Sequence, residues 1–286
     1  MISYGRAKRN RKYQTKGIFN IRWNDCCSRS FWRGVQFLQL ILDRKYDIAL
    51  DEFDQKYGIE ATAIAQDPEW QRNVTGRLYY ASGTFVLNND ASRCSTSFIG
   101  KDADRNIIYL LTANHCLPTE NFETLTIRQP QLPGSSEISV KSQDVRFVSH
   151  PEGKDIAIIA VKSSQAVEQL PTIPYSAISA EGINKELCAM VYPGLMGKDY
   201  PQTPMAIKTN MQHNMFGQPR KKENLYVLES SGWGGMSGGG FSICQNDTVI
   251  GVVSEMGPLD HGEMAIELLD SNVDQMILEA GNLFGH

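Results

Sequence analysis

A serine set among glycines, in Gly235-Met236-Ser237-Gly238-Gly239, is the first part of the sequence whose composition suggests covalent chemistry. Glycines on both sides permit a tight turn that leaves the Ser237 hydroxyl exposed. The same turn can direct the backbone N–H groups of Gly235 and Ser237 at one point, as an oxyanion hole requires. The motif therefore predicts a nucleophilic serine with two amide donors, and its simplest alternative is an ordinary glycine-rich turn.

The order of the other candidate residues separates two kinds of nucleophilic serine. In α/β-hydrolases, whose nucleophile turn also has the pattern Gly-x-Ser-x-Gly, the acid and then the histidine follow the serine. Here the only histidines after Ser237 are His261 and His286. Upstream, His115 ends one apolar segment and Asp155 opens another. The order His, Asp, Ser favours the chymotrypsin-like arrangement over the α/β-hydrolase one.

The motifs resemble those of the chymotrypsin/trypsin family of serine endopeptidases, and are similar to its bacterial branch, which includes glutamyl and lysyl endopeptidases. Thr112-Ala113-Asn114-His115-Cys116 matches the family's T-A-A-H-C with one substitution. Asp155-Ile156-Ala157-Ile158-Ile159 matches its D-I-A-L-L strand, and the glycine-flanked serine motif matches G-D-S-G-G with Met236 in place of Asp. Gly251-Val252-Val253-Ser254 resembles the strand that borders the substrate. The resemblance covers about residues 78–280.

The resemblance implies a serine endopeptidase whose catalytic triad is His115, Asp155 and Ser237, with no metal and no organic cofactor. His115 would take the proton of the Ser237 hydroxyl, and Asp155 would hold the required tautomer of the imidazole. Ser254 would support Asp155 with a hydrogen bond. Met236 replaces the Asp that binds the new N-terminal amine in digestive members, so that activation switch is not expected. The other histidines are expected on the surface or in loops (His150, His213, His261 and His286).

Four of the six cysteines occupy positions that the family uses for disulfides. The resemblance implies one bridge between Cys94 and Cys116, beside His115, and another between Cys188 and Cys244 in the second barrel. The alternative is buried free thiols. Because disulfides persist in oxidising compartments, we expect a secreted or periplasmic protein, although the sequence as given shows no secretory signal peptide. Two cysteines stay unassigned (Cys26 and Cys27).

The residue preference at the cleavage site is less sharply indicated. Family spacing places Ser231 and Gly232 at the floor of the substrate pocket, and Met256 and Gly262 on the facing strands near Ser254. A Ser floor with a Met wall predicts a small or apolar side chain before the scissile bond. The alternative is an acidic rim that favours Lys or Arg, formed by three neighbouring carboxylates (Glu255, Asp260 and Glu263).

The elements that must position these residues are predicted to be strands. From about residue 76, short β-branched and aromatic runs alternate with turn residues, which is typical of an all-β sandwich or barrel. With the resemblance, this predicts an all-β fold of two six-stranded antiparallel β-barrels, at about 78–162 and 183–268, joined by a Pro-containing stretch. A C-terminal helix at about 270–280, which Asp270 or Ser271 can cap, would complete a protease domain over 76–286.

Residues 1–75 are expected to form a partly helical N-terminal extension that acts as a propeptide or a cap. Apolar side chains at helical spacing over 31–58 suggest one or two amphipathic helices. The extension carries 13 Lys and Arg against 9 Asp and Glu, in a chain whose formal net charge is −4. A basic chain end can bind nucleic acid, but a solvated end is the commoner case, so nucleic acid is not expected as a partner.

The overall composition is that of a globular protein. Hydrophobic residues make up 41% and charged residues 21% of the chain, which excludes general disorder. No apolar stretch reaches the roughly 18 residues of a membrane-spanning helix. We expect a monomer that acts on protein or peptide substrates. The alternative is a catalytically inactive chymotrypsin-fold module that binds peptides or proteins; the presence of all three triad residues favours the enzyme.

Overall fold

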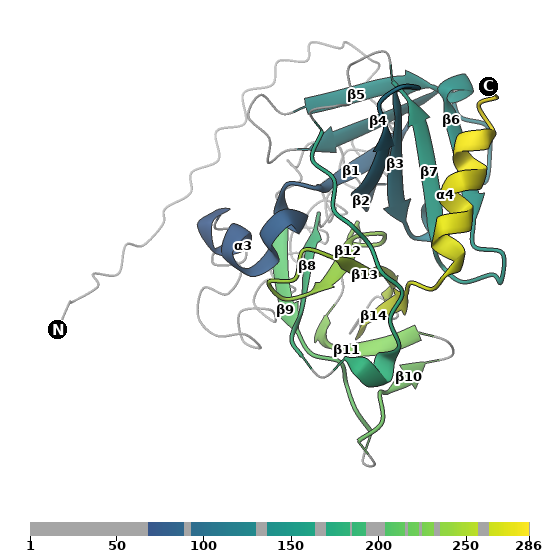
Figure 1. The fold of residues 1–286 in the computed structure, drawn as a ribbon. Coiled ribbons are helices and arrows are strands. Elements are labelled where there is room, and N and C mark those ends of the chain that lie inside the picture. The colour runs from purple at the N-terminus through teal and green to yellow at the C-terminus, as the bar shows by residue number, and fades with distance from the viewer. Residues whose placement is uncertain are drawn as a thin grey trace, which may run out of the picture. The chain divides into compact units, whose positions relative to one another are not determined.

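The computed structural model describes most of the chain after residue 67 (68–88, 93–129, 136–163, 170–183, 185–192, 204–214, 217–222, 225–231, 235–256 and 263–285). Over these residues the fold is mostly strands in two curled antiparallel sheets, followed by a C-terminal helix (Figure 1). The predicted all-β, chymotrypsin-like class is confirmed. The predicted helices over 31–58, the basic chain end, Cys26 and Cys27 lie outside the described residues.

The first sheet is built from the half of the fold that precedes the connecting stretch. It has seven antiparallel strands in the order β5-β4-β1-β2-β3-β7-β6. Their bounds are β1 (Ser82–Leu87), β2 (Arg93–Asp102), β3 (Ile107–Thr112), β4 (Thr124–Gln129), β5 (Ser136–Lys141), β6 (Val145–Ser149) and β7 (Ala157–Lys162). The neighbouring strands β3 and β7 are apolar and buried almost throughout, and the C-terminal helix packs on β7.

The second sheet also has seven strands, in the order β10-β11-β14-β13-β12-β8-β9. Their bounds are β8 (Leu187–Val191), β9 (Met205–Thr209), β10 (Lys221–Lys222), β11 (Leu225–Ser231), β12 (Gly240–Ile243), β13 (Val249–Met256) and β14 (Glu263–Leu268). Seven strands in each sheet exceed the six expected, and in this sheet the count includes β10, which is only two residues long. The sheet has its own apolar core, which includes Phe241, Val253 and Ile266.

The C-terminal helix α4 (Asn272–Asn282) follows the second sheet in sequence but packs on strands β6 and β7 of the first (Figure 1). Its buried side chains include Val273, Met276 and Ala280, as the helical spacing predicts. Of the two candidate caps, Asp270 makes the contact: its Oδ1 accepts the Asn272 N–H at 2.9 Å, whereas Ser271 makes no capping bond through its side chain. No described helix is long and apolar enough to cross a membrane.

The described part of the connecting stretch, residues 170–183, is bonded to strands of both sheets. The Ile173 N–H donates to the Phe98 carbonyl of β2 at 2.9 Å, and the Val249 N–H of β13 donates to the Pro174 carbonyl at 2.8 Å. These backbone bonds place the chain between the two halves and satisfy its polar groups there.

A short helix that the sequence analysis did not predict, α3 (Pro68–Thr75), precedes the first strand. It packs against β8 and β9, and Gln71 Nε2 donates to the Pro204 carbonyl at 2.6 Å. Eight residues are too few for a stable isolated helix, so tertiary contacts such as these must supply most of its stability. The predicted extension therefore includes, at its C-terminal end, a helix that belongs to the packed fold.

Backbone spacing in the first sheet gives a stability prediction. A Cβ added to Gly83 of β1 would lie 2.5 Å from the Arg128 carbonyl oxygen, whereas one added to Gly100 of β2 would meet only the Tyr109 ring, at 3.5 Å. We expect Gly83→Ala to lower the free energy of unfolding by about 1–3 kcal/mol. Gly100→Ala, the matched control, should change it by about 0.5 kcal/mol or less. Urea unfolding measures both, and equal effects would contradict the strand spacing described.

Candidate active site

Two neighbouring strands bring the predicted histidine and aspartate together. His115 lies in a short 3₁₀ helix (Asn114–Cys116) just after β3, and Asp155 lies just before β7. The two strands are paired antiparallel, with Thr112 opposite Ala157. Because the end of one antiparallel strand meets the start of its neighbour, both residues lie at the same edge of the first sheet.

The carboxylate of Asp155 receives three hydrogen bonds. His115 Nδ1 lies 2.7 Å from its Oδ2, the His115 backbone N–H donates to its Oδ1 at 2.8 Å, and Ser254 Oγ donates to its Oδ2 at 2.6 Å. A carboxylate only accepts, so the proton of the neutral ring lies on Nδ1. The other ring nitrogen, Nε2, is then left as a base on a side chain that is 49% exposed.

These contacts set the ionisation of Asp155. Burial alone raises the pKa of this carboxyl group, but the hydrogen bonds from His115 and Ser254, and the attraction of the His115 ring, outweigh it and lower the pKa below its usual value. Asp155 is therefore ionised at neutral pH and available to orient His115 and to stabilise its positive form.

The loop that carries Ser237 is shaped by two glycines with positive φ, Gly235 at 87° and Gly238 at 82°. A Cβ on Gly238 would lie 2.0 Å from Thr112 Oγ1 and 3.0 Å from the Ala113 nitrogen. The loop therefore packs directly on the segment that leads into His115. The Ser237 residue itself is 6% exposed.

Two features of this loop bear on its role in the candidate site. Within the part of the chain that the structure describes, the backbone N–H groups of Gly235 and Ser237 donate to no acceptor, so both are available to a ligand. In the same residues, Ser237 Oγ makes no hydrogen bond to His115. Catalytic hydrogen bonds are often long in ligand-free proteins and tighten when the substrate binds.

Ser95, which the sequence analysis did not single out, holds the Ser237 loop from the first sheet. Its N–H donates to the Ser237 carbonyl at 2.8 Å, and its Oγ donates to the Gly235 carbonyl at 2.7 Å and accepts the Tyr192 N–H at 2.9 Å. Ser95 is fully buried in β2. The one sequence signal was its position directly after Cys94, because a disulfide beside His115 places the next residue near the site.

Both disulfides that the resemblance implied are present. Cys94 is bonded to Cys116, with Cα atoms 6.1 Å apart, and Cys188 is bonded to Cys244, with Cα atoms 4.8 Å apart. The first bridge links the neighbour of Ser95 to the neighbour of His115. It thus joins the strand that holds the Ser237 loop to the segment that carries the histidine.

Met236 is fully buried in the apolar core of the second sheet. Its uncharged side chain cannot form an ion pair with an N-terminal amine, and the absence of a zymogen switch of that kind stays a prediction. The loop is held by Ser95 and by two backbone bonds to β13, Gly238 N–H to the Val253 carbonyl and Val253 N–H to the Gly239 carbonyl, both at 2.8 Å.

The predicted substrate pocket is described only in part. Ser254, on β13, contacts Asp155 as stated above, and the backbones of Ser231 and Met256 lie at the ends of β11 and β13. The side chains of these last two lie outside what the structure describes, as do Gly232, Gly262 and the three carboxylates of the alternative acidic rim. The apolar and the acidic pocket therefore both stay predictions.

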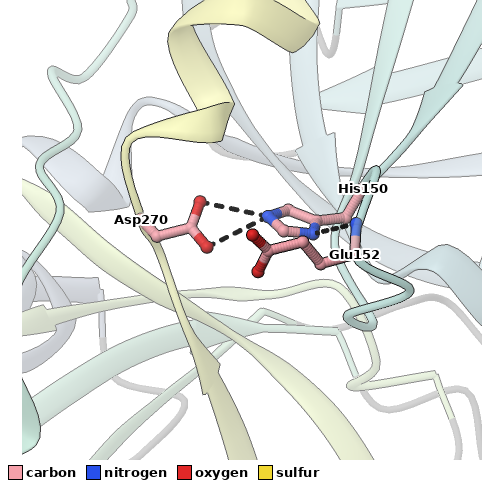
Figure 2. A group of neighbouring side chains, drawn as sticks. All are labelled: His150, Glu152 and Asp270. Carbon is pink, nitrogen blue, oxygen red and sulfur yellow. Dashed lines mark hydrogen bonds and ion pairs between the residues drawn. The ribbon is translucent and has the colours of Figure 1, made fainter.

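His150 lies in the loop after β6, as expected, but it is buried, 3% exposed, and is not a surface histidine. With Glu152 and Asp270 it forms the one described group whose ligand atoms lie near enough, within 4.8 Å of one another, to suggest a metal (Figure 2). The donors do not fit an ion, however. The Lys154 ammonium already contacts Asp270 Oδ2, and both ring nitrogens of His150 are engaged, Nδ1 by the Glu152 N–H and Nε2 by Asp270.

A comparison with solved structures finds one of similar fold with a TM-score above 0.5, and that protein is a serine protease. The chain is similar to the thermostable serine protease AL20 from an extremophilic microorganism, with a TM-score of 0.54 and 14% identity over 72% of this chain and 99% of that one. The apo form of the MamO protease domain of Magnetospirillum magneticum has a TM-score of 0.48 and 13% identity over 71% of this chain and 97% of that one. The serine endoprotease of Yersinia pestis has a TM-score of 0.46 and 14% identity over 71% of this chain and 63% of that one. No protein-family model and no curated protein matches the sequence.

The lowered pKa of Asp155 predicts how its contribution to stability depends on pH. A carboxyl group whose pKa is lower in the folded than in the unfolded chain stabilises the fold above its unfolded pKa of about 3.9, and this contribution is lost as the pH falls through the folded value. We expect Asp155→Asn to cost about 1–3 kcal/mol of unfolding free energy at pH 7 and progressively less below about pH 4.

Unfolding of the wild type and Asp155→Asn between pH 2.5 and 7.5 measures this difference, with Asp104→Asn, at an exposed turn, as the control. A difference that stays constant across the range would contradict the assigned contacts.

Proposed function

We propose that the chain is a serine endopeptidase that hydrolyses peptide bonds through His115, Asp155 and Ser237 by way of an acyl-enzyme. The observation that carries the proposal is the contact of His115 Nδ1 with Asp155 Oδ2 at 2.7 Å, supported by Ser254, in a chain with the fold of serine proteases. Fold alone does not assign a reaction, so the proposal depends on the chemistry of this site.

Acylation begins when Ser237 Oγ attacks the carbonyl carbon of the substrate. His115 Nε2 takes the hydroxyl proton, because Nδ1 is protonated and bonded to Asp155, and the imidazolium that forms is stabilised by the Asp155 carboxylate. We expect the hydrogen bond between Ser237 Oγ and His115 Nε2 to form as substrate excludes water from the site.

The tetrahedral intermediate carries a negative charge on the former carbonyl oxygen. The N–H groups of Gly235 and Ser237 have no acceptor of their own in the described residues, which supports their role as the oxyanion donors. Each such donor contributes about 3–4 kcal/mol to stabilising the transition state. His115 then gives its proton to the leaving amine, and the intermediate collapses to the acyl-enzyme.

Water completes the reaction by the same route. His115 takes a proton from the water as it attacks the ester carbonyl, and returns it to Ser237 Oγ when the acid product leaves. No step draws on a metal or an organic cofactor. The two disulfides are compatible with action outside the cytoplasm, in a secreted or periplasmic setting. A small or apolar residue before the scissile bond stays our proposal for the substrate.

Replacing the nucleophile tests the proposal directly. We expect Ser237→Ala to lower kcat for a peptide-library substrate by roughly 10⁶-fold and to abolish labelling by a fluorophosphonate probe. Ser176→Ala, which removes an exposed hydroxyl, should keep both activities. Undiminished proteolysis by Ser237→Ala would refute the proposal. Peptide binding with neither turnover nor labelling of the wild type would favour the inactive binding module.

Ser95 provides a second test, of how the oxyanion loop is held. Removing its hydroxyl breaks the hydrogen bond to the Gly235 carbonyl and the one from the Tyr192 N–H, at a cost of about 1–3 kcal/mol. We expect Ser95→Ala to lower kcat by roughly 10- to 100-fold, with little change in KM.

Ser97→Ala is the matched control for this variant. Ser97 lies on the same strand and is equally buried, but its Oγ has no hydrogen-bond partner among the described residues. If both variants lose activity to the same extent, the loss reflects packing of β2, and the proposed support of the oxyanion loop is wrong.

A further inference from the structure

The buried histidine described above belongs to a cluster centred on Asp270, at the start of α4. The Asp270 carboxylate accepts His150 Nε2 at 3.0 and 3.1 Å and the Asn272 N–H at 2.9 Å, and it forms an ion pair with the Lys154 ammonium. Figure 2 shows the carboxylate of Asp270 facing the edge of the His150 ring from a different segment of the chain. Although burial raises the pKa of Asp270, the bonds from Lys154 and His150 lower it far more, so the carboxylate is charged.

The groups that Asp270 binds lie at two points of the loop that carries Asp155. The loop starts at His150, whose N–H donates to the Ile156 carbonyl at 3.0 Å, and whose carbonyl accepts the Gly153 N–H at 3.0 Å. Lys154 is the residue immediately before Asp155. One carboxylate therefore holds the loop both at its start and next to the proposed catalytic aspartate.

A second carboxylate, Glu267, lies three residues before Asp270 and close to the loop that carries Asp155, on the side of the second sheet. Glu267 of β14 lies opposite Val252 of β13, on the face that also presents Ser254, and is 4% exposed. Burial raises the pKa of Glu267 above its usual value, although the nearby Lys154 ammonium and Asp155 backbone N–H act in the opposite direction. The start of α4 thus contacts the loop at two residues, and Glu267 at the end of β14 lies close to the same loop.

We propose that Asp270 is a positioning residue that, through its ion pair with Lys154, holds Asp155 in the position from which its carboxylate binds His115. The inference rests on the proposed function, because it assigns Asp270 a role only if Asp155 orients the catalytic base. Asp270 touches no reacting atom; it acts through the loop. Substrate does not contact this cluster in the proposed mechanism, so loosening it should lower kcat and leave KM nearly unchanged.

Lys154→Met separates positioning from a simple effect of charge. If Lys154 acted only by its field, removing a positive charge would make the His115 imidazolium easier to form, and the acid limb of the kcat/KM profile would move to higher pH. If Lys154 positions Asp155, a loosened carboxylate stabilises the imidazolium less, and the acid limb moves to lower pH. The two explanations predict opposite signs.

We therefore expect Lys154→Met and Asp270→Asn each to lower kcat by roughly 10-fold and to move the acid limb to lower pH. The double variant should be no worse than the poorer single one, because both break the same contact. Lys154→Arg, which can keep the ion pair, should restore kcat and the profile. Asp274→Asn, in the first turn of α4, is the control, since Asp274 accepts the hydroxyl of Tyr175, which lies outside the loop.

The inference would be overturned if the acid limb of the kcat/KM profile stayed in place or moved to higher pH in Lys154→Met. It would also be overturned if the losses of kcat in the two single variants added up in the double variant. Thermal unfolding of each variant checks that it is folded. Proton NMR of the ligand-free protein gives a readout that needs no turnover: the signal of the His115 Nδ1 proton, assigned by its loss in His115→Ala, should broaden in Lys154→Met and Asp270→Asn.

The outcomes also separate the two proposals. A sharp signal in these variants, with an active wild type and an inactive Ser237→Ala, would refute the positioning role and leave the proposed function standing. A wild type without activity, in which the Nδ1 proton still responds to Lys154→Met, would refute the enzyme and retain the structural coupling.

Discussion

The hydrogen bonds to the Asp155 carboxylate are the interaction on which the proposed site depends. One donor, His115, comes from the first half of the fold, and another, Ser254, comes from the second sheet. Both bind the same oxygen, Oδ2, so the two halves of the fold must be correctly placed relative to one another for Asp155 to orient the histidine. A charged group with these partners is costly to leave unpaired, which makes the junction of the sheets a constraint on the site as well as on the fold.

Each half of the fold holds the reactive segment of the other. The loop that carries Asp155 belongs to the first half, and the residues that hold it, Ser254, Glu267 and Asp270, belong to the second. Conversely, the Ser237 loop belongs to the second half and is held by Ser95 of the first. The helix α4 extends this exchange, because it follows the second sheet in sequence and packs on the first. Such reciprocal support keeps groups from distant parts of the chain within reach of one another.

Much of this arrangement could be predicted from the sequence, because the residues concerned belong to compact motifs. The continuous apolar runs of β3 and β7 predicted buried strands, and the residues at their ends, His115 and Asp155, are in contact as expected. The fold class, the C-terminal helix and Asp270 as one of two candidate caps were likewise predictable from periodicity and capping chemistry. Strand β2 was harder to predict, because its buried residues Ser95, Thr96 and Ser97 are polar and interrupt the apolar pattern of a buried strand.

What the sequence did not predict arises from contacts between distant segments. The burial of His150 depends on Asp270, which is 120 residues away, and the role of Ser95 depends on a loop 140 residues away. No local pattern encodes such pairs. Helix α3 was not predicted for a related reason, because contacts with β8 and β9 stabilise its eight residues more than their intrinsic helix propensity does.

The central claim, that Ser237 is the nucleophile activated by His115, is tested most directly by trapping the acyl-enzyme. The protein is mixed with an activated ester, quenched in acid within the first turnover, and digested for mass spectrometry. The account predicts one acyl group per chain, located on Ser237 and absent from His115→Ala. An acyl group on another residue, or one that forms on Ser237 equally fast without His115, would contradict it.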